Sequence, residues 1–307
     1  MRDIAGGDDP QINAVIEIIK HTNADVLALQ DFDYDLTGAA LSLFAQQTGY
    51  PFSFSSQPNS GMPTGLDMNG DGRLGGPRDA QGYGVFSGQG GMALLSKFPI
   101  LQDQVQDLSD MLWRDIPDPL LPTLDGAPFP SAQTQTVQRL SSTGHWVVPV
   151  RTPNSEFHLL MFHATPPVFD GDEDYNGKRN HDEITLWRHF LDGTVGKPIS
   201  SPFVIAGDAN LDPHTGEGLR SAIQKLLSDT RIQDPEPRGH SPNRATDTVD
   251  WTDPTPGNMR VDYVLPSSHW RIKDSGVVWP TTDNPLFETA TKASRHHLVW
   301  ADLELIP

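Results

Sequence analysis

Three apolar, strand-like runs near the end of the chain each carry polar residues at or beside one end. In chain order, the runs lie within residues 203–210, 260–265 and 294–300. Asp208 and Asn210 follow the first run. Asp262 stands inside the second, and His296 precedes the third. Polar residues at strand ends can gather at one edge of a sheet, where binding and catalytic groups are often found. Two carboxylates, an amide and an imidazole in such a place favour hydrolytic chemistry on a phosphoester.

Strands and helices alternate irregularly along the rest of the chain. Apolar patterns predict strands at 26–29, 91–96, 157–163, 203–206, 261–265 and 298–303, and helices beginning at Asp9-Pro10 and covering 181–191 and 219–227. Asp before Pro is typical of a helix N-cap and first turn. Residues 51–90 and 101–135 are rich in turn-forming residues and are expected to be long loop insertions. The pattern predicts one α/β or α+β domain over residues 1–307 with a buried sheet core.

The first helix leads directly into the strand at 26–29, with no strand ahead of it. Its apolar residues Ile12, Val15, Ile16 and Ile19 recur at helical spacing and need a surface to pack on. We therefore expect that a first strand belongs ahead of this helix and is missing from the chain.

The chain is strongly acidic and contains no cysteine. Its 22 Lys and Arg residues stand against 40 Asp and Glu residues, for a net charge of -18. Such a surface repels polyanions, so extended duplex DNA is a disfavoured partner. A small or exposed phosphoester can still bind through a bridging cation. The absence of cysteine excludes disulfides, thiolate nucleophiles and Cys-ligated zinc. No apolar run reaches the ~18 residues that suggest a membrane span.

Several of the polar residues have two interpretations from the residues alone. His163 closes the apolar run 157–163, where it suits a general acid, a phosphate donor or simply a packing residue. Asp262 needs a partner if it is buried, and a histidine is the natural one because the pair fixes the imidazole tautomer. Asp208 and Asn210, taken alone, fit an Asx-type turn as well as a catalytic site.

Six segments, taken together, resemble one known family. They are residues 24–31, 92–99, 162–166, 207–210, 260–265 and 294–303. In this order, and over nearly the whole chain, they are similar to the endonuclease/exonuclease/phosphatase superfamily with its DNase I-like fold. The resemblance implies a four-layer α/β/β/α sandwich in which two mixed β-sheets lie face to face with helices outside. It also implies a hydrolase that uses Mg²⁺ or Mn²⁺ to cleave a phosphodiester or phosphomonoester by in-line attack of water, as a nuclease, phosphodiesterase or phosphatase does.

The resemblance also implies a role for each candidate residue. Asp208 would activate the attacking water, and Asn210 would hold the phosphate or the metal. Asp262 would orient His296, which would contact the phosphate and assist the leaving group. His163 resembles the first catalytic histidine of the DNase branch. The implied ligands of the catalytic metal are Asp31, Asp208 and Asn210.

Three departures from the family pattern leave two alternatives open. No strand with the family's first asparagine precedes Arg2. The family's metal-binding glutamate falls at Asp31, whose shorter side chain still suits Mg²⁺ directly or through a water. The aspartate before the final histidine falls at Arg295, which would repel a cation but could bind the substrate phosphate. The chain is therefore either a working phosphoesterase or a catalytically impaired member that acts as a calcium-binding or surface-binding protein.

Two acidic segments resemble calcium-binding loops. The candidate ligands are Asp67, Asn69, Asp71 and Asp79 in the first segment, and Asp172, Asp174, Asn176 and Glu183 in the second. Acidic, glycine-rich surface turns would give the same spacing. The second segment follows His163, so its neighbours Arg179 and Asn180 could instead bind substrate. Acidity and calcium-like loops favour a periplasmic or secreted protein, if a signal peptide preceded the chain.

Overall fold

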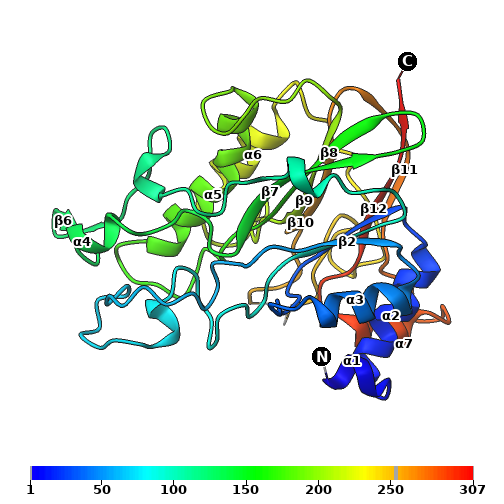
Figure 1. Ribbon diagram of the computed structural model, residues 1–307, viewed down its shortest axis with the longest axis horizontal. Helices are drawn as coiled ribbons and strands as arrows, with labels where there is room; N and C mark the ends of the chain where they lie inside the picture. Colours follow the sequence, from blue (N-terminus) through cyan, green and yellow to red (C-terminus); the bar gives the residue numbers. More distant parts are fainter. Residues whose placement is uncertain (1, 252–254, 307) are drawn as a thin grey trace.

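The computed structural model describes residues 2–251 and 255–306, which form four layers (Figure 1). Two β layers lie face to face in the middle. Helices α1 (Arg2–Gly6), α2 (Pro10–Thr22), α3 (Ala39–Thr48) and α7 (Phe287–Ala293) cover one side, and α5 (Tyr175–Leu191) and α6 (Ser221–Leu227) cover the other. The expected α+β sandwich, α/β/β/α in its layers, is confirmed.

The first β layer is a mixed, five-stranded sheet. Its strands are β4 (Gln106–Asp107), β7 (Gly144–Arg151), β8 (Glu156–His163), β9 (Phe203–Asp208) and β10 (Asp262–Pro266), in the spatial order β10-β9-β8-β7-β4. Strands β8 and β9 are parallel, and the other neighbours are antiparallel. Because β8 and β9 run in the same direction, their last residues, His163 and Asp208, lie side by side at one edge of the sheet.

The second β layer consists of two antiparallel pieces. One piece has the order β1-β3-β2, formed by β1 (Val26–Leu29), β2 (Phe52–Phe54) and β3 (Ala93–Ser96). The other is a pair of β11 (Trp270–Val277) and β12 (Val299–Leu305), with an irregular register between Ile272 and Asp274. Among the described strands none joins the two pieces, so the expected pair of mixed sheets is seen only in the five-stranded one.

Strand β8 shows why its sequence is apolar at nearly every position. Leu160 packs against Trp187 of α5 on one face of the sheet. The next residue, Met161, packs with Trp146 between the two β layers. Successive side chains of a strand point to opposite faces, so a strand covered on both faces needs an unbroken apolar run.

Helix α2 begins and ends as the sequence predicts. The Asp9 side chain accepts hydrogen bonds from the backbone amides of Gln11 and Ile12, and Pro10 is the first helical residue. Asn23 closes the helix in the left-handed conformation, with φ of 52°. Ile12, Val15, Ile16 and Ile19 pack together in the core beneath the helix, as their spacing indicates.

Other elements are shifted from their expected limits. Helix α5 begins at Tyr175 rather than at residue 181, because its first turns bury polar side chains and so lack an apolar pattern. The expected insertion 51–90 contains only β2 and the short η1 (Pro77–Asp79) as regular structure. The insertion 101–135 contains η2 (Gln102–Gln104), β4, η3 (Trp113–Asp115), β5 (Thr123–Leu124), β6 (Ala127–Pro128) and α4 (Ala132–Gln135). Within the described residues, no helix has both the length and the apolar composition needed to cross a membrane.

Candidate active site

The predicted residues meet at the edge where β8 and β9 end and β10 begins. The parallel register of β8 and β9 pairs His163 with Asp208. The antiparallel register of β9 and β10 pairs Asp208 with Asp262. Three neighbouring strands therefore place these residues in one row, with Asp208 in the middle.

Asp208 and Asp31 flank the imidazole of His163. The Nε2 atom of His163 lies 3.5 Å from Oδ2 of Asp208, and its Nδ1 atom lies 3.9 Å from Oδ1 of Asp31. The two carboxylates differ in exposure, because the side chain of Asp208 is 6% exposed and that of Asp31 is 78% exposed. Asp31 directly follows Gln30 at the end of β1 and has a positive φ of 54°, which turns the chain sharply at the site.

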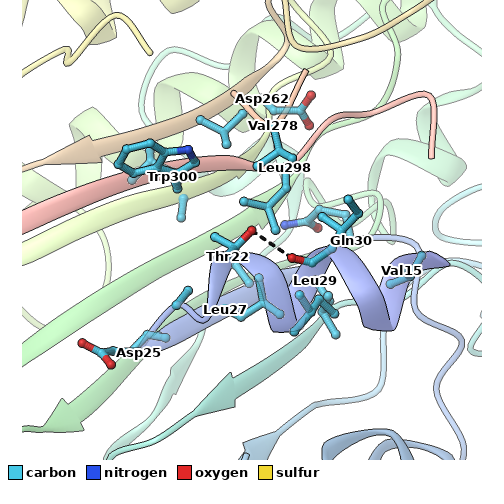
Figure 2. A pocket seen from close by; sticks show the side chains of 18 of the residues that line it. Val15, Thr22, Asp25, Leu27, Leu29, Gln30, Asp262, Val278, Leu298 and Trp300 are labelled. Atoms are coloured by element: carbon cyan, nitrogen blue, oxygen red, sulfur yellow. Dashed lines mark hydrogen bonds between the residues drawn. The ribbon is translucent and has the colours of Figure 1, made fainter. Parts of the chain in front are cut away.

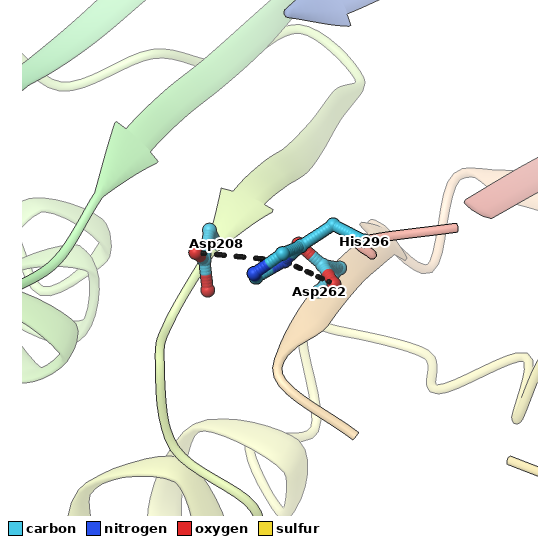
Figure 3. A group of neighbouring side chains, drawn as sticks. All are labelled: Asp208, Asp262 and His296. Carbon is cyan, nitrogen blue, oxygen red and sulfur yellow. Dashed lines mark hydrogen bonds and ion pairs between the residues drawn. The ribbon is translucent and has the colours of Figure 1, made fainter. Parts of the chain in front are cut away.

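His296 lies on the other side of Asp208 (Figure 3). Its Nδ1 atom is 3.1 Å from Oδ2 of Asp262 and 3.9 Å from Oδ2 of Asp208. Thr248 donates its hydroxyl hydrogen to Oδ2 of Asp262 over 2.8 Å, and so holds that carboxylate in place. The ring of Trp251 meets the His296 ring edge-on, with centroids 5.7 Å apart. The histidine is thus fixed by a carboxylate and an aromatic ring.

Asn210 connects the two strand ends. Its backbone N–H donates to Oδ1 of Asp208 over 2.7 Å, and its side-chain amide donates to the carbonyl of Ala164 over 3.0 Å. Its φ of 48° is positive, a conformation that Asn tolerates better than most residues. The segment is therefore both an Asx-type turn and part of the site. The turn occupies Oδ1 of Asp208 and leaves Oδ2 facing the two imidazoles.

The pKa values of Asp208 and His296 are both raised at this site. Burial, and then the charge of Asp262, raise the pKa of Asp208 to about 6, although His296 and His163 oppose this rise. Burial alone would lower the pKa of His296. The charge and hydrogen bond of Asp262, together with the charges of Asp208 and Asp31, outweigh burial and raise the pKa of His296 to about 10.

Helix α5 anchors both loops that leave the edge where β8 and β9 end and β10 begins, which we call the catalytic edge because it gathers the candidate catalytic residues. The Asn180 amide donates to the carbonyls of Thr165 and Ala209, each over 2.7 Å. The Glu183 carboxylate accepts from the backbone amides of Thr165 and Ser142. Both side chains are fully buried. These contacts hold the loops that follow His163 and Asp208 at a fixed separation.

A family model described as the endonuclease/exonuclease/phosphatase family matches residues 4–296. The chain belongs to this family. Its members act on phosphoester substrates and generally use a divalent metal ion, so the family expected from the sequence is confirmed. No curated protein is a significant match to the chain.

Several solved structures share the fold of this chain at low sequence identity. An endonuclease/exonuclease/phosphatase protein from Beutenbergia cavernae DSM 12333 has a TM-score of 0.58 at 16% identity, over 97% of this chain and 66% of that chain. A mannosyl-6-phosphatase from Bacteroides thetaiotaomicron VPI-5482 has a TM-score of 0.55 at 14% identity, over 99% and 95% of the two chains. The human Nocturnin catalytic domain, with a bound sulfate anion, has a TM-score of 0.54 at 13% identity, over 97% and 87%. This family member therefore has the DNase I-like fold, and it spans about two thirds of the first of these chains.

Two residues expected to bind substrate in this family member have other roles. The Arg179 guanidinium is buried and donates to the carbonyls of Gln81, Leu140 and Ser141, so it holds loops together. Asn180 is occupied with the backbone contacts described above. The expectation that these two side chains bind substrate is wrong, because both are buried and their donor groups bind backbone carbonyls.

Arg295 is exposed, and its carbonyl accepts a hydrogen bond from the backbone amide of Asp250. It precedes His296, but it is not among the residues that line the large cavity beside the site. A role for Arg295 in substrate binding therefore remains a prediction.

The prediction of a calcium-binding loop over residues 172–183 is wrong. Of its candidate ligands, Asn176 and Glu183 lie within helix α5, and Asp174 is the residue before the helix. Glu183 is buried beneath the catalytic loop, where backbone amides and the Ser142 hydroxyl bind its carboxylate. Asp172 therefore cannot share a loop-bound ion with Glu183, because a helix does not wrap its residues around one point as an EF-hand loop does.

The first expected calcium loop contains carboxylates bound to the backbone. Asp67 accepts from the amides of Gly70 and Gly72. Asp79 is buried and accepts from the amides of Met68 and Gly76. Among the described residues, no group of ligand atoms close enough to hold a metal ion includes the carboxylates of Asp67, Asp71 and Asp79. The fourth expected ligand, Asn69, lies in the same turn as Asp67.

The catalytic edge of this family member suits a divalent cation. Over residues 2–251 and 255–306, the acidic and imidazole ligand atoms that converge within 4.8 Å of one another belong to Asp208, Asp262 and His296. Nδ1 of His296 is already paired with Asp262. The carboxylates of Asp208 and Asp31 are therefore more available as ligands of a metal ion. Carboxylate oxygens are the ligands that Mg²⁺ and Mn²⁺ prefer. The residues present therefore fit such an ion.

Sequence patterns missed Thr248 and Trp251, which support Asp262 and His296. Both stand in a polar stretch with no strand or helix periodicity, so no pattern marks them. Their partners lie 14 residues away for Thr248 and at the far end of the chain for Trp251. Only the fold brings them to the site.

Proposed function

We propose that this chain is a divalent-metal-dependent phosphoesterase that cleaves a small or exposed phosphoester by attack of water. The observation that carries the proposal is the position of Asp208 between two histidines. Its Oδ2 atom lies 3.5 Å from Nε2 of His163 and 3.9 Å from Nδ1 of His296. A buried carboxylate with imidazoles on both sides can take a proton from water while the imidazoles bind the phosphate.

Asp208 is the general base in this proposal. With a pKa of about 6 it is ionised at neutral pH, yet it accepts a proton more readily than an ordinary aspartate. Its Oδ1 atom is held by the backbone amide of Asn210, so Oδ2 receives the proton. The water must therefore lie on the side of the carboxylate that faces His163 and His296.

His296 is the cationic partner. Its pKa of about 10 keeps the imidazole protonated at neutral pH. Nδ1–H binds Asp262, so Nε2–H is free to donate to a phosphoryl oxygen or to the leaving oxygen. The ring cannot swing away easily, because Trp251 packs against it and Thr248 holds Asp262.

The divalent cation would be held by Asp31 and Asp208, and when bound it would neutralise phosphoryl charge and favour in-line displacement. The exposed Asp31 side chain suits an ion that keeps several waters. The net charge of -18 makes an extended polyanion a poor substrate. We therefore propose a compact substrate whose phosphate alone enters the catalytic edge.

The test is hydrolysis of bis(p-nitrophenyl) phosphate and p-nitrophenyl phosphate with Mg²⁺, Mn²⁺ or Ca²⁺, each compared with EDTA. We expect turnover that EDTA abolishes and that Asp208→Asn lowers by about 100- to 10,000-fold. Asp103→Asn, at an exposed aspartate in η2, is the matched control and should retain activity.

Folded protein that turns over neither ester with any of these ions would contradict the proposal. That result, with a calcium-dependent rise in melting temperature, would favour the alternative of a catalytically impaired, calcium-binding family member. The preference between the two esters assigns the substrate class, because a phosphodiesterase cleaves the first ester and a phosphatase the second.

A further inference from the structure

Arg244 joins two loops beside the catalytic edge. It lies in the segment between α6 and β10, and its guanidinium forms ion pairs with Asp212 and Asp247. Asp212 follows Asp208 by four residues, and Asp247 directly precedes Thr248. The side chains of Asp212 and Asp247 are 0% exposed, whereas that of Arg244 is 33% exposed. One partly exposed cation therefore bridges two buried anions.

Every nitrogen of this guanidinium takes part in the bridge. Nε donates to Oδ1 of Asp247 over 3.0 Å, and Nη1 donates to Oδ1 of Asp212 over 3.4 Å. Nη2 contacts both carboxylates, through Oδ2 of Asp212 and Oδ1 of Asp247. The rigid, planar fork of an arginine can hold two carboxylates at once, which the single ammonium of a lysine does less well. Arg244 is therefore better suited to bridging the loops than to binding a substrate phosphate.

Asp212 fixes the loop that follows β9. Its Oδ1 atom accepts hydrogen bonds from the backbone amides of His214 over 2.7 Å and Thr215 over 2.9 Å. Its Oδ2 atom accepts from the backbone amide of Arg260 over 2.8 Å. Since Arg260 lies in the segment that enters β10, this carboxylate ties the end of β9 to the start of β10.

Asp247 fixes the loop that carries Thr248. Its Oδ2 atom accepts from the backbone amide of Arg244 over 2.9 Å and from the Ser241 hydroxyl over 3.0 Å. Because Oδ1 binds the Arg244 guanidinium, both oxygens of this buried carboxylate are engaged. The backbone at Thr248 is therefore held directly beside the bridge.

Thr248 passes this placement on to Asp262 and His296. Its hydroxyl donates to Oδ2 of Asp262 over 2.8 Å and accepts from the backbone amide of the same residue over 3.1 Å. Its carbonyl accepts from the backbone amide of His297 over 2.8 Å. Thr248 thus contacts both segments from which the pair of Asp262 and His296 is built.

Asp262 and His296 face an open space on another side. Both line the large cavity beside the site, whose volume is about 1450 Å³. Figure 2 shows Asp262 among the side chains that border this cavity. Among the described residues that line it, neither Thr248 nor Asp247 is included. The contacts through Thr248 therefore lie on the packed side, and the position of the pair depends on them.

We infer that Arg244 is a positioning residue: by bridging the two loops, it sets the distance between Asp208 and His296. Without the guanidinium, two buried carboxylates would face each other with no cation between them, and like charges removed from water repel strongly. The loops would move apart, and the 3.9 Å between Oδ2 of Asp208 and Nδ1 of His296 would widen. The effect on turnover rests on the proposed function, whereas the effect on the position of His296 does not.

The test compares Arg244→Gln with Arg231→Gln in the full chain. Arg231 is the matched control, because it also bridges two aspartates, Asp192 and Asp229, but lies beside the start of β9 and not at its end. We expect Arg244→Gln to shift or broaden the Nδ1–H proton resonance of His296 in metal-free protein. We also expect it to lower kcat for bis(p-nitrophenyl) phosphate about 10- to 100-fold with little change in KM. The control should keep both the resonance and kcat.

Arg244→Lys keeps the charge but offers one nitrogen in place of three, so we expect it to restore part of kcat and to shift the His296 resonance less. An unchanged His296 resonance in folded Arg244→Gln, or in Arg244→Lys if the glutamine variant does not fold, would overturn the inference. A raised KM with unchanged kcat would also overturn it, because Arg244 would then bind substrate directly. Since the resonance is measured without substrate or metal, it decides the inference even if the protein hydrolyses neither ester.

Discussion

Nε2 of His163 lies 3.5 Å from Oδ2 of Asp208, where two neighbouring parallel strands end in register. The contact joins a strand-end imidazole to the most buried carboxylate of the catalytic edge. The pKa of Asp208 depends on this neighbour, because the charge of His163 lowers it while burial and Asp262 raise it. His163 therefore limits the rise in the pKa of Asp208 that burial and Asp262 cause.

His163→Gln should raise the pKa of Asp208 above its value of about 6, because burial and the charge of Asp262 would lose one opposing charge. The measurement is a ¹³C NMR titration of aspartate carboxyl groups in metal-free protein. His158→Gln, at a histidine on the same strand that binds Ser201 away from the catalytic edge, is the matched control. A titration of Asp208 that is the same in both variants would show that His163 does not influence it.

Thr248 is predicted to act on catalysis through Asp262. Thr248→Val removes the hydrogen bond to Oδ2 of Asp262, so we expect His296 to be less firmly placed and turnover of the diester to fall about 10- to 100-fold. Thr248→Ser keeps the hydroxyl and should restore most of the activity. The nitrogen chemical shifts of His296 report its placement independently of turnover. Equal losses in the Val and Ser variants would assign Thr248 a packing role instead.

The sequence predicted that His163, Asp208 and Asp262 lie together, because each of them interrupts or ends an apolar run. His163, Asp208 and Asp262 follow that rule, and strand register then places them side by side. His296 lies before a strand, and the strand order brings it to Asp262. Such residues are recognisable in a sequence because a polar group within an apolar strand is unusual unless it has a function.

Helix α5 shows why the predictions for Arg179, Asn180 and the second calcium-binding loop failed. Its first turns bury Arg179, Asn180 and Glu183, which in the sequence look like a solvated or ion-binding segment. Their partners are backbone groups of loops far away in the chain, such as Leu140 and Ala209. Burial of a polar helix face depends on those distant carbonyls and amides, and no local pattern encodes them.

Asn180 is predicted to support both the stability and the activity of the protein. Asn180→Asp replaces the donating amide with an acceptor that faces the carbonyls of Thr165 and Ala209, so two buried carbonyls lose their partner. We expect the free energy of unfolding to fall by about 1–3 kcal/mol. We also expect kcat to fall while the KM of the diester changes little, because the loops that follow His163 and Asp208 would separate.

The matched control is Asn154→Asp, which makes the same chemical change at an exposed position. It should leave the unfolding curve, measured in urea, and the kinetic constants unchanged. An Asn180→Asp protein with lower stability but unaltered kcat at a temperature where it is fully folded would show that the anchor serves folding alone.

Fully buried His145 is predicted to make the protein less stable in acid. Burial, helped by the charge of Arg179, lowers its pKa from 6.5 to about 4, although a hydrogen bond to the carbonyl of Glu183 opposes this. Between these pH values the unfolded chain binds a proton at this residue and the folded protein does not. The contribution of His145 to stability is therefore complete above pH 6.5 and is lost as the pH falls toward 4.

At about 1.4 kcal/mol per pH unit, this loss amounts to roughly 3 kcal/mol at most. The carboxylates of the chain also titrate in acid, so the decisive quantity is the difference between wild type and His145→Gln in urea unfolding at several pH values. We expect the glutamine variant to lose less stability than wild type between pH 6.5 and 4, since it has no proton to bind there. Parallel curves for the two proteins would mean that His145 takes up its proton over the same pH range in the folded and unfolded states, with the Ser141 hydroxyl and the Glu183 carbonyl as acceptors for its two N–H groups.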